Sequence, residues 1–155
     1  MSQHLDFRSA TQDDLERIVD MLADDHLGQQ LEHNTRPLPT EYRDAFEAIE
    51  RDPNNDLVVA CADGVVVGVL QITFIPNLSH LGAWRALIEG VRIHRDYRAQ
   101  GLGHQMFEWA IAQAKTKGCR MVQLTTDKSR PQAKAFYEQL GFVPSHEGMK
   151  LHLTD

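Results

Sequence analysis

Apolar residues recur along this chain at two spacings, which predict strands in some stretches and helices in others. A short strand is predicted at residues 5–8. A helix follows, because apolar residues then recur on one helical face, at Leu15, Ile18, Val19 and Leu22. Residues 25–39 lose this pattern and are largely polar, so we expect a loop there. A second helical stripe follows the loop, formed by Tyr42, Ala45, Phe46 and Ile49.

The middle of the chain reads as strands. Two β-branched runs, at residues 57–62 and 65–74, are separated by Asp63-Gly64, a dipeptide that supplies the positive φ angles of a two-residue hairpin turn. An antiparallel hairpin is therefore predicted. A loop through residues 76–82 leads to a further strand at 86–94.

The C-terminal third alternates between helix and strand. We expect a helix at 103–117, a strand at 121–126, a helix at 131–140 and a closing strand at 149–153. Pro131 stands at the start of the last helix and Gly141 just past its end, which is the usual polarity of these residues. The order of elements predicts an α/β fold, α+β in some schemes.

Composition and charge narrow the class of protein. The chain has 155 residues, 42% hydrophobic and 25% charged, which suits a single domain over residues 1–155. A formal charge of −6 leaves no broad basic face, so we expect no nucleic-acid partner and favour a cationic substrate. The longest apolar run, 65–70, is too short to span a bilayer, and the start of the chain lacks a signal-peptide pattern. We therefore expect a cytoplasmic protein without a membrane partner. We also expect its two cysteines, Cys61 and Cys119, to be reduced.

The segment 88–106 carries the clearest chemistry. A strand that enters a glycine-spaced turn and then a helix points backbone N–H groups and the positive end of the helix dipole at one place. Gly101 and Gly103 are predicted to let an anion approach the backbone, and Arg98 adds a forked cationic donor. A glycine pair alone is more simply an ordinary turn, so the context decides.

This segment resembles a motif of the GCN5-related N-acetyltransferase (GNAT) family. The family pattern Arg/Gln-x-x-Gly-x-Gly/Ala is met in full by Arg98-Ala99-Gln100-Gly101-Leu102-Gly103. A second segment, which ends Phe136-Tyr137-Glu-Gln-Leu-Gly141-Phe142, is similar to the family's C-terminal motif, and Phe7-Arg8-x-Ala10-Thr11-x-x-Asp14-Leu15 matches near the start. The resemblance spans nearly the whole chain. It implies a mixed, mostly antiparallel sheet of six to seven strands flanked by four helices.

The resemblance also implies a site for acetyl-CoA as co-substrate. Backbone donors from residues 100–104 would hold the pyrophosphate with help from Arg98, while the main chain at Val91 and Ile93 would pair with the pantetheine arm. Many members carry Asn after the next strand; Asp127, Lys128 and Ser129 stand in that region, and Arg130 or Lys134 is expected to reach CoA phosphates instead. The full set of expected cofactor-binding residues is Val91, Arg92, Ile93, Arg98, Ala99, Gln100, Gly101, Leu102, Gly103, His104, Asp127, Arg130, Lys134 and Tyr137.

Two residues are candidates for catalysis. Tyr137 lies on the apolar stripe of its helix and by itself reads as a core residue; the resemblance implies that its hydroxyl protonates the departing thiolate of CoA. Glu89 alternates with apolar residues on one strand face. Either it is a structural carboxylate bonded to a loop or to Arg92, or partial burial raises its pKa and makes it a base, directly or through water.

The resemblance implies an N-acetyltransferase that moves an acetyl group from acetyl-CoA to a primary amine by direct attack, with a small cationic molecule as the expected acceptor. The alternative from another class is a non-catalytic module that senses acyl-CoA. The histidines do not have the spacing of metal ligands, and the chain has no motif of a catalytic nucleophile. We therefore expect no metal and no covalent intermediate. His26, His33, His80, Trp84 and Arg85 are candidate acceptor contacts; the alternatives are that Trp84 caps the core and that His26 and His33 contact only solvent. The acceptor's identity, the acyl-chain preference and the choice between monomer and homodimer stay open.

Overall fold

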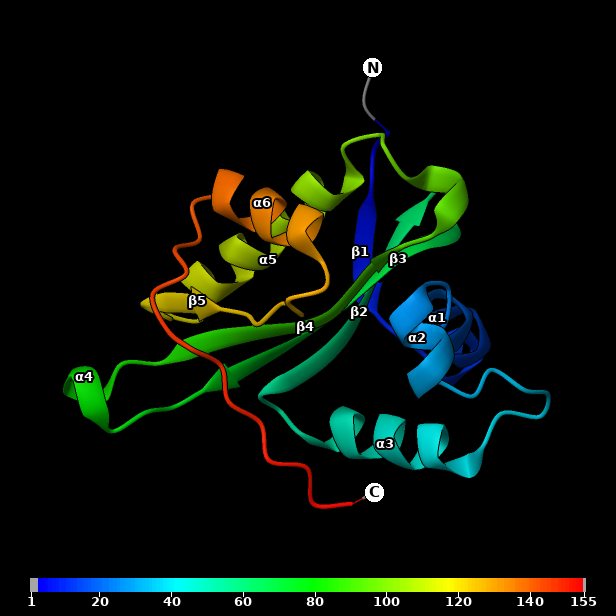
Figure 1. Cartoon of the computed structure of the whole chain (residues 1–155), viewed down its shortest axis with the longest axis horizontal. Helices are drawn as coiled ribbons and strands as arrows, with labels where there is room; N and C mark the ends of the chain where they lie inside the picture. Colours follow the sequence, from blue (N-terminus) through cyan, green and yellow to red (C-terminus); the bar gives the residue numbers. More distant parts are fainter. Residues whose placement is uncertain (1–2, 155) are drawn as a thin grey trace.

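The computed structural model describes residues 3–154 and shows one sheet with helices on both faces (Figure 1). Within that range the sheet has five strands in the order β1-β2-β3-β4-β5, namely β1 (Asp6–Ser9), β2 (Asn55–Ala62), β3 (Val65–Ile75), β4 (Arg85–Ile93) and β5 (Met121–Gln123). The first four strands are antiparallel neighbours, and β5 runs parallel to β4. The prediction of an α/β fold with a mixed, mostly antiparallel sheet is confirmed.

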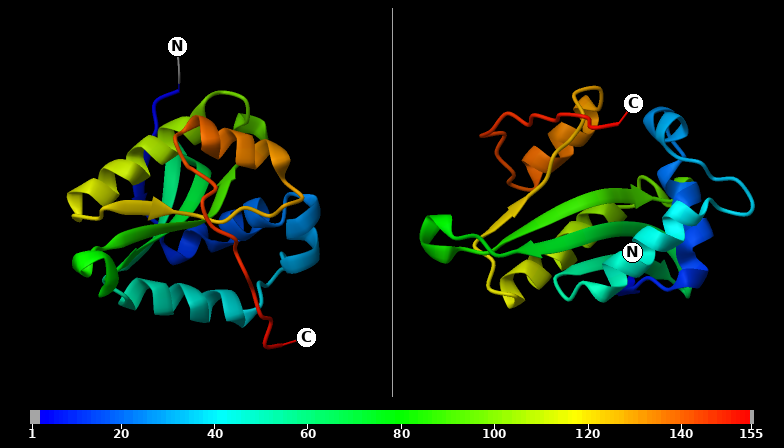
Figure 2. Two further views of the ribbon diagram at one scale, coloured as in Figure 1. Left: turned by 60° about the vertical axis from the view of Figure 1, so that its left-hand side comes forward. Right: turned by 90° about the horizontal axis from the view of Figure 1, so that it is seen from below.

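The four predicted helices are present and form two layers. α1 (Leu15–Leu22) and α3 (Thr40–Arg51) cover one face of the sheet, and α5 (Leu102–Thr116) and α6 (Pro131–Gln139) lie on the other, as the two views of Figure 2 show. Short 3₁₀ turns at Gln12–Asp14 and Arg95–Tyr97 lead into α1 and into the loop before α5. Within residues 3–154, no helix is long and apolar enough to span a bilayer.

Two further short helices lie in segments that were predicted as loops, α2 (His26–Leu31) and α4 (Ser79–Gly82). α2 begins where the Asp25 carboxylate accepts a hydrogen bond from the Gly28 N–H at 2.6 Å. An aspartate that caps a free N–H in this way stabilises even a short helix. The spacing of apolar residues does not predict this helix, because the segment is largely polar.

The alternation of side chains along β2 and β3 builds a core on each face of the sheet. Val58 and Ala60 point into the cluster beneath α5, with Phe107 and Met106 of that helix fully buried there. Val59, one position along, belongs to the opposite cluster, which α1 and α3 complete. Because residues on a strand alternate between the two faces, a continuous β-branched run predicts a sheet that is covered on both sides.

The predicted closing strand at 149–153 is wrong. Within residues 3–154 this segment joins no strand, and the side chains of its alternating apolar residues are almost fully exposed: Met149 (93%), Leu151 (86%) and Leu153 (89%). Alternation shows only that a segment can present an apolar face, whereas a strand also needs a neighbouring edge to pair with. The described sheet therefore has five strands instead of six or seven.

Candidate active site

β4 and β5 separate partway along the length of β4. Their pairing runs from Arg85–Met121 to Leu87–Gln123 and ends there, although β4 continues to Ile93. β5 was predicted to extend to residue 126 and stops at 123 because it loses its partner at this point. The second half of β4 thus has an edge that β5 leaves unpaired.

A β-bulge bends β4 at the same place. Gln71 of β3 pairs with Glu89 and Val69 pairs with Arg92, so β4 spans three positions where β3 spans two. Gly90 takes a positive φ of 61°, a conformation that glycine adopts without a steric penalty. The bulge redirects the strand and its side chains toward the start of α2, and it leaves main-chain groups near Val91 outside the regular ladder.

The glycine loop borders an open cavity of about 290 Å³ at the start of α5. Seven of the expected cofactor-binding residues line this cavity, namely Ile93, Arg98, Ala99, Gly101, Leu102, Gly103 and His104. Tyr97 and Phe136 also line it. Phe136 could have been found, because it belongs to the same C-terminal motif as Tyr137. The other expected residues, Val91, Arg92, Gln100, Asp127, Arg130, Lys134 and Tyr137, do not line it.

The two glycines of the loop serve different purposes. Gly101 precedes α5 in the left-handed region, at φ 77° and ψ 11°, and a Cβ atom placed there would meet nothing within 4 Å. Backbone conformation, not space, is what requires glycine at this position. A Cβ atom on Gly103 would lie 3.3 Å from Cζ of Phe136, so Gly103 lets α5 and α6 approach closely. Sequence reasoning had assigned both glycines to the approach of an anion.

The Arg98 side chain turns back onto its own loop. Its Nε donates to the Ile93 carbonyl oxygen at 3.1 Å, and its Nη2 donates to Oδ2 of Asp24 at 3.3 Å. The Val91 carbonyl in turn accepts from Nη1 of Arg92 at 2.9 Å. Both carbonyls that were expected to pair with pantetheine thus already accept one guanidinium N–H. Each has a second lone pair for a further donor.

Tyr137 stands in an aromatic cluster at the base of α6. Its ring lies 5.4 Å from that of Phe107, 5.7 Å from that of Phe136 and 6.1 Å from that of Phe142, all edge-to-face. Burial raises the pKa of the phenol, and the positive charges of Arg92 and Arg130 partly offset this rise. The hydroxyl therefore stays protonated at neutral pH, as a proton donor must.

Arg92 and Arg130 meet at one carboxylate beside Tyr137. Nη2 of Arg130, the residue before α6, lies 2.8 Å from Oδ2 of Asp25, and Nη2 of Arg92 lies 3.9 Å from the same oxygen. The segment that enters α6 passes close to α2 in both views of Figure 2. Burial lowers the pKa of Arg92, as does the nearby charge of Arg130, while Asp25 acts in the opposite direction. Arg92 and Arg130 are called the arginine pair below, and Asp25 is the aspartate that they share.

Glu89 is exposed on the unpaired stretch of β4, so the partial burial expected for it is absent. The bulge at Gly90 is the physical reason, because it interrupts the alternation from which burial was inferred. Among residues 3–154 the Glu89 carboxylate makes no hydrogen bond and no ion pair, so it is not the bonded structural carboxylate of the other interpretation either.

Three of the expected charged residues are engaged locally. Asp127 accepts from both the backbone N–H (2.8 Å) and the hydroxyl (2.7 Å) of Ser129, which lowers the pKa of its carboxyl and fixes the turn before α6. Lys134 and His104 lie one helical turn from glutamates of their own helices, at 3.8 Å from Glu138 and 2.7 Å from Glu108.

The candidate acceptor contacts His80, Trp84 and Arg85 lie at the far end of β4, next to α4 (Figure 1). Arg85 and Arg92 are separated by about 23 Å along the strand at 3.3 Å per residue. These three residues are therefore far from the arginine pair. His26 begins α2, next to Asp25 in the chain, and the His33 N–H donates to the Tyr42 hydroxyl at 2.9 Å.

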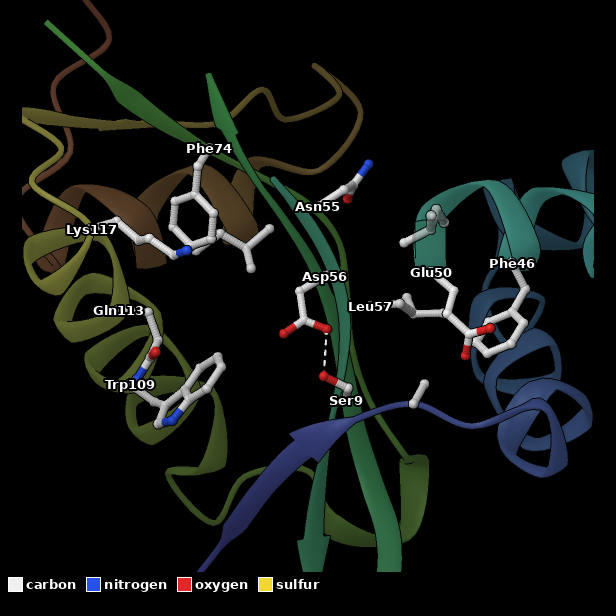
Figure 3. A pocket seen from close by; sticks show the side chains of 13 residues that line it. Ser9, Phe46, Glu50, Asn55, Asp56, Leu57, Phe74, Trp109, Gln113 and Lys117 are labelled. Carbon is white, nitrogen blue, oxygen red and sulfur yellow. Dashed lines mark hydrogen bonds between the residues drawn. The ribbon is translucent and has the colours of Figure 1, made fainter. Parts of the chain in front are cut away.

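A second cavity, also of about 290 Å³, opens between α3 and α5 at the end of β1. Figure 3 shows Phe46 and Glu50 on one side of it and Trp109 and Gln113 on the other. Between them the Ser9 hydroxyl donates to Oδ1 of Asp56 at 2.8 Å. None of the expected site residues lines this cavity.

Comparison with known proteins gives the family. The family profile described as "Acetyltransferase (GNAT) family" matches residues 15–142. A crystal structure described as a transcriptional regulator from Bacillus halodurans is 55% identical, covers 97% of this chain and all of its own, and superposes with a TM-score of 0.93. A structure described as an acetyltransferase from Agrobacterium tumefaciens is 26% identical, covers 95% of this chain and 99% of its own, and has a TM-score of 0.82.

An aminoalkylphosphonate N-acetyltransferase from Salmonella typhimurium is 28% identical over 141 residues, which are 91% of this chain and 86% of that protein. The profile covers most of the chain, including the glycine loop and the Phe136-Tyr137 motif that form the geometry described above. The chain therefore belongs to the acetyltransferase (GNAT) family and is an acetyl-CoA-dependent N-acetyltransferase.

Proposed function

We propose that this enzyme acetylates the primary amine of a small molecule by direct attack on acetyl-CoA, with Tyr137 as the general acid. The observation that carries the proposal is the position of Tyr137: it stands on α6, packs against the same core cluster as Val91 and Leu124, and has a pKa that burial raises, so its hydroxyl stays protonated. The relative from Salmonella typhimurium supports an amine acceptor, since its name describes an amine that also carries a phosphonate.

The donor is proposed to lie with its phosphates in the cavity at the start of α5. The helix N-terminus supplies backbone N–H groups and a positive dipole there, and Arg98, which is paired with Asp24, lines the cavity as a cationic donor. The pantetheine arm would then follow the unpaired edge of β4, where the main chain offers groups for strand-like pairing. This route leads the thioester toward the bulge and Tyr137.

The reaction transfers the acetyl group from sulfur to nitrogen. The ammonium loses one proton through water to Glu89, which is the unengaged carboxylate on this stretch of β4. The amine then attacks the thioester carbon, and a main-chain N–H near Val91 stabilises the oxyanion. The C–S bond breaks and the sulfur takes the proton of the Tyr137 hydroxyl, which is replaced by the second proton from the new amide nitrogen.

The test is release of CoA thiol from acetyl-CoA with a panel of primary amines, with mass spectrometry to identify the N-acetyl product. The proposal expects thiol and product in equal amounts. Thiol release without an acetylated amine would mean hydrolysis and would contradict it. Binding of acetyl-CoA without any turnover would favour a sensor instead, which is the role that fits the description of the Bacillus halodurans relative as a regulator.

A further inference from the structure

The arginine pair lies apart from the cavity assigned to the CoA phosphates. Neither Arg92 nor Arg130 lines that cavity, whereas Arg98 does. The pair comes instead from two elements that border the reaction centre, the end of β4 and the start of α6. The charges of both guanidinium groups act on Tyr137 and offset part of the rise that burial causes in the pKa of its phenol. Any group they hold is therefore near the reacting atoms.

Two guanidinium groups share the Asp25 carboxylate, and Glu32 is a further carboxylate whose charge acts on Arg92. Asp25 is also committed elsewhere, since its Oδ1 accepts the Gly28 N–H that begins α2. Its Oδ2 is within hydrogen-bond distance of Arg130 at 2.8 Å but not of Arg92 at 3.9 Å.

Arg92 is the under-satisfied member. Its side chain is only 21% exposed, and its Nε is buried with no hydrogen-bond partner among the described residues 3–154. Its Nη1 donates to the Val91 carbonyl and its Nη2 lies 3.9 Å from Asp25, so the donors of this guanidinium are only partly used, and buried polar groups are normally hydrogen-bonded. The forked guanidinium geometry matches the paired oxygens of a carboxylate or a phosphonate.

We infer that Arg92 and Arg130 bind an acidic group, a carboxylate or a phosphonate, carried by the acceptor amine. The inference rests on the proposed function and names its substrate class: amines with an acidic group a short chain away from the nitrogen. The acceptor is thus a zwitterion, not the simple cation that net charge suggested. Asp25 positions Arg130, and the ammonium end of the acceptor faces the thioester between Tyr137 and Glu89.

The experiment compares acceptors that share an amine and differ in the second group: 2-aminoethylphosphonate, β-alanine, and ethanolamine as the acid-free control. Wild-type enzyme is expected to prefer an acidic acceptor by about 100-fold or more in kcat/KM, because hydrogen bonds to charged groups are the strong ones. The first two acceptors distinguish phosphonate from carboxylate. Equal kcat/KM for all three would overturn the inference and leave the proposed function intact.

The variants Arg92→Gln and Arg130→Gln are expected to lower kcat/KM for the acidic acceptor by about 10- to 100-fold each. The loss on ethanolamine should be clearly smaller than the loss on the acidic acceptor, and Arg130→Lys should recover part of the loss on the acidic acceptor. The matched control is Arg43→Gln, at an exposed arginine of α3. Equal losses on all acceptors would mean a structural role and would contradict the assignment.

A direct binding measurement keeps the two proposals separable. Methylphosphonate and acetate, titrated into CoA-bound protein and followed by NMR, should shift resonances of the wild-type enzyme and not of Arg92→Gln. If no amine is acetylated but one of these anions binds in this way, the proposed function fails and the anion site stands. If amines are acetylated and neither anion binds, the anion site is wrong.

Discussion

Replacement of Tyr137 by Phe removes one oxygen and leaves the ring in place. The ring packs edge-to-face against Phe107, Phe136 and Phe142, and the phenol makes no hydrogen bond within residues 3–154. The free energy of unfolding should therefore change by less than about 1 kcal/mol. The loss of a positioned acid should lower kcat by about 100-fold or more, which corresponds to about 2.7 kcal/mol of transition-state stabilisation.

The assay is thiol release at saturating acetyl-CoA and acceptor, with the dissociation constant of acetyl-CoA measured by calorimetry. Affinity should stay within about twofold, since the lost oxygen acts on the leaving thiolate and not on the bound donor. The folded-state pKa of Tyr137 is raised, so the hydroxyl keeps its proton from neutral pH to above the ordinary value near 10. Loss of this proton should therefore not reduce the wild-type kcat at any pH below about 10. Tyr42→Phe is the matched control for the chemical change, because it removes the same oxygen from a tyrosine of α3, whose hydroxyl donates to Glu32 and accepts the His33 N–H. Equal kcat in Tyr137→Phe and wild type would remove Tyr137 from the mechanism.

Three further perturbations test other parts of the structure. Arg98→Ala should weaken acetyl-CoA binding by about tenfold in calorimetry with kcat nearly unchanged, and unchanged affinity would refute its phosphate role. Phe107→Ala should lower the free energy of unfolding in urea by about 3–5 kcal/mol, because this fully buried ring supports Phe136, Tyr137 and Phe142; a loss under 1 kcal/mol would show a looser core. Hydrogen bonds from Arg8 lower the pKa of Asp14, so its contribution to stability is present above the unfolded pKa near 3.9 and is lost as the pH falls through the lower folded value. Thermal unfolding measured from pH 6 to pH 2 should show a smaller loss of stability with falling pH in Asp14→Asn than in wild type. Parallel curves of stability against pH for the two proteins would contradict this.

Local signals in the sequence were enough for the elements that depend on neighbouring residues. Asp63 and Gly64 take φ angles of 49° and 80°, so the dipeptide forms the hairpin turn that it predicted. The glycine loop and the start of α5 also follow from a contiguous pattern, and seven of its expected residues line one cavity. Such features need only short-range geometry.

Features that depend on distant pairing were not predictable in the same way. The tail at 149–153 has a strand's alternation but no strand partner, and nothing in its own residues reveals that. Asp25, Arg92 and Arg130 are far apart in the chain and come together only through the bulge in β4 and the cap of α2. Net charge averages over the whole surface and does not describe one site, so the expectation of a cationic acceptor that rests on it stays a prediction.

The most direct test of the central claim is a single incubation of the purified enzyme with acetyl-CoA and 2-aminoethylphosphonate, followed by mass spectrometry of the small molecules. The account predicts N-acetylated aminoethylphosphonate and free CoA in equal amounts in the wild type, with formation about 100-fold or more slower in Tyr137→Phe. No acetylated product from this amine, from β-alanine or from ethanolamine, despite bound acetyl-CoA, would contradict it.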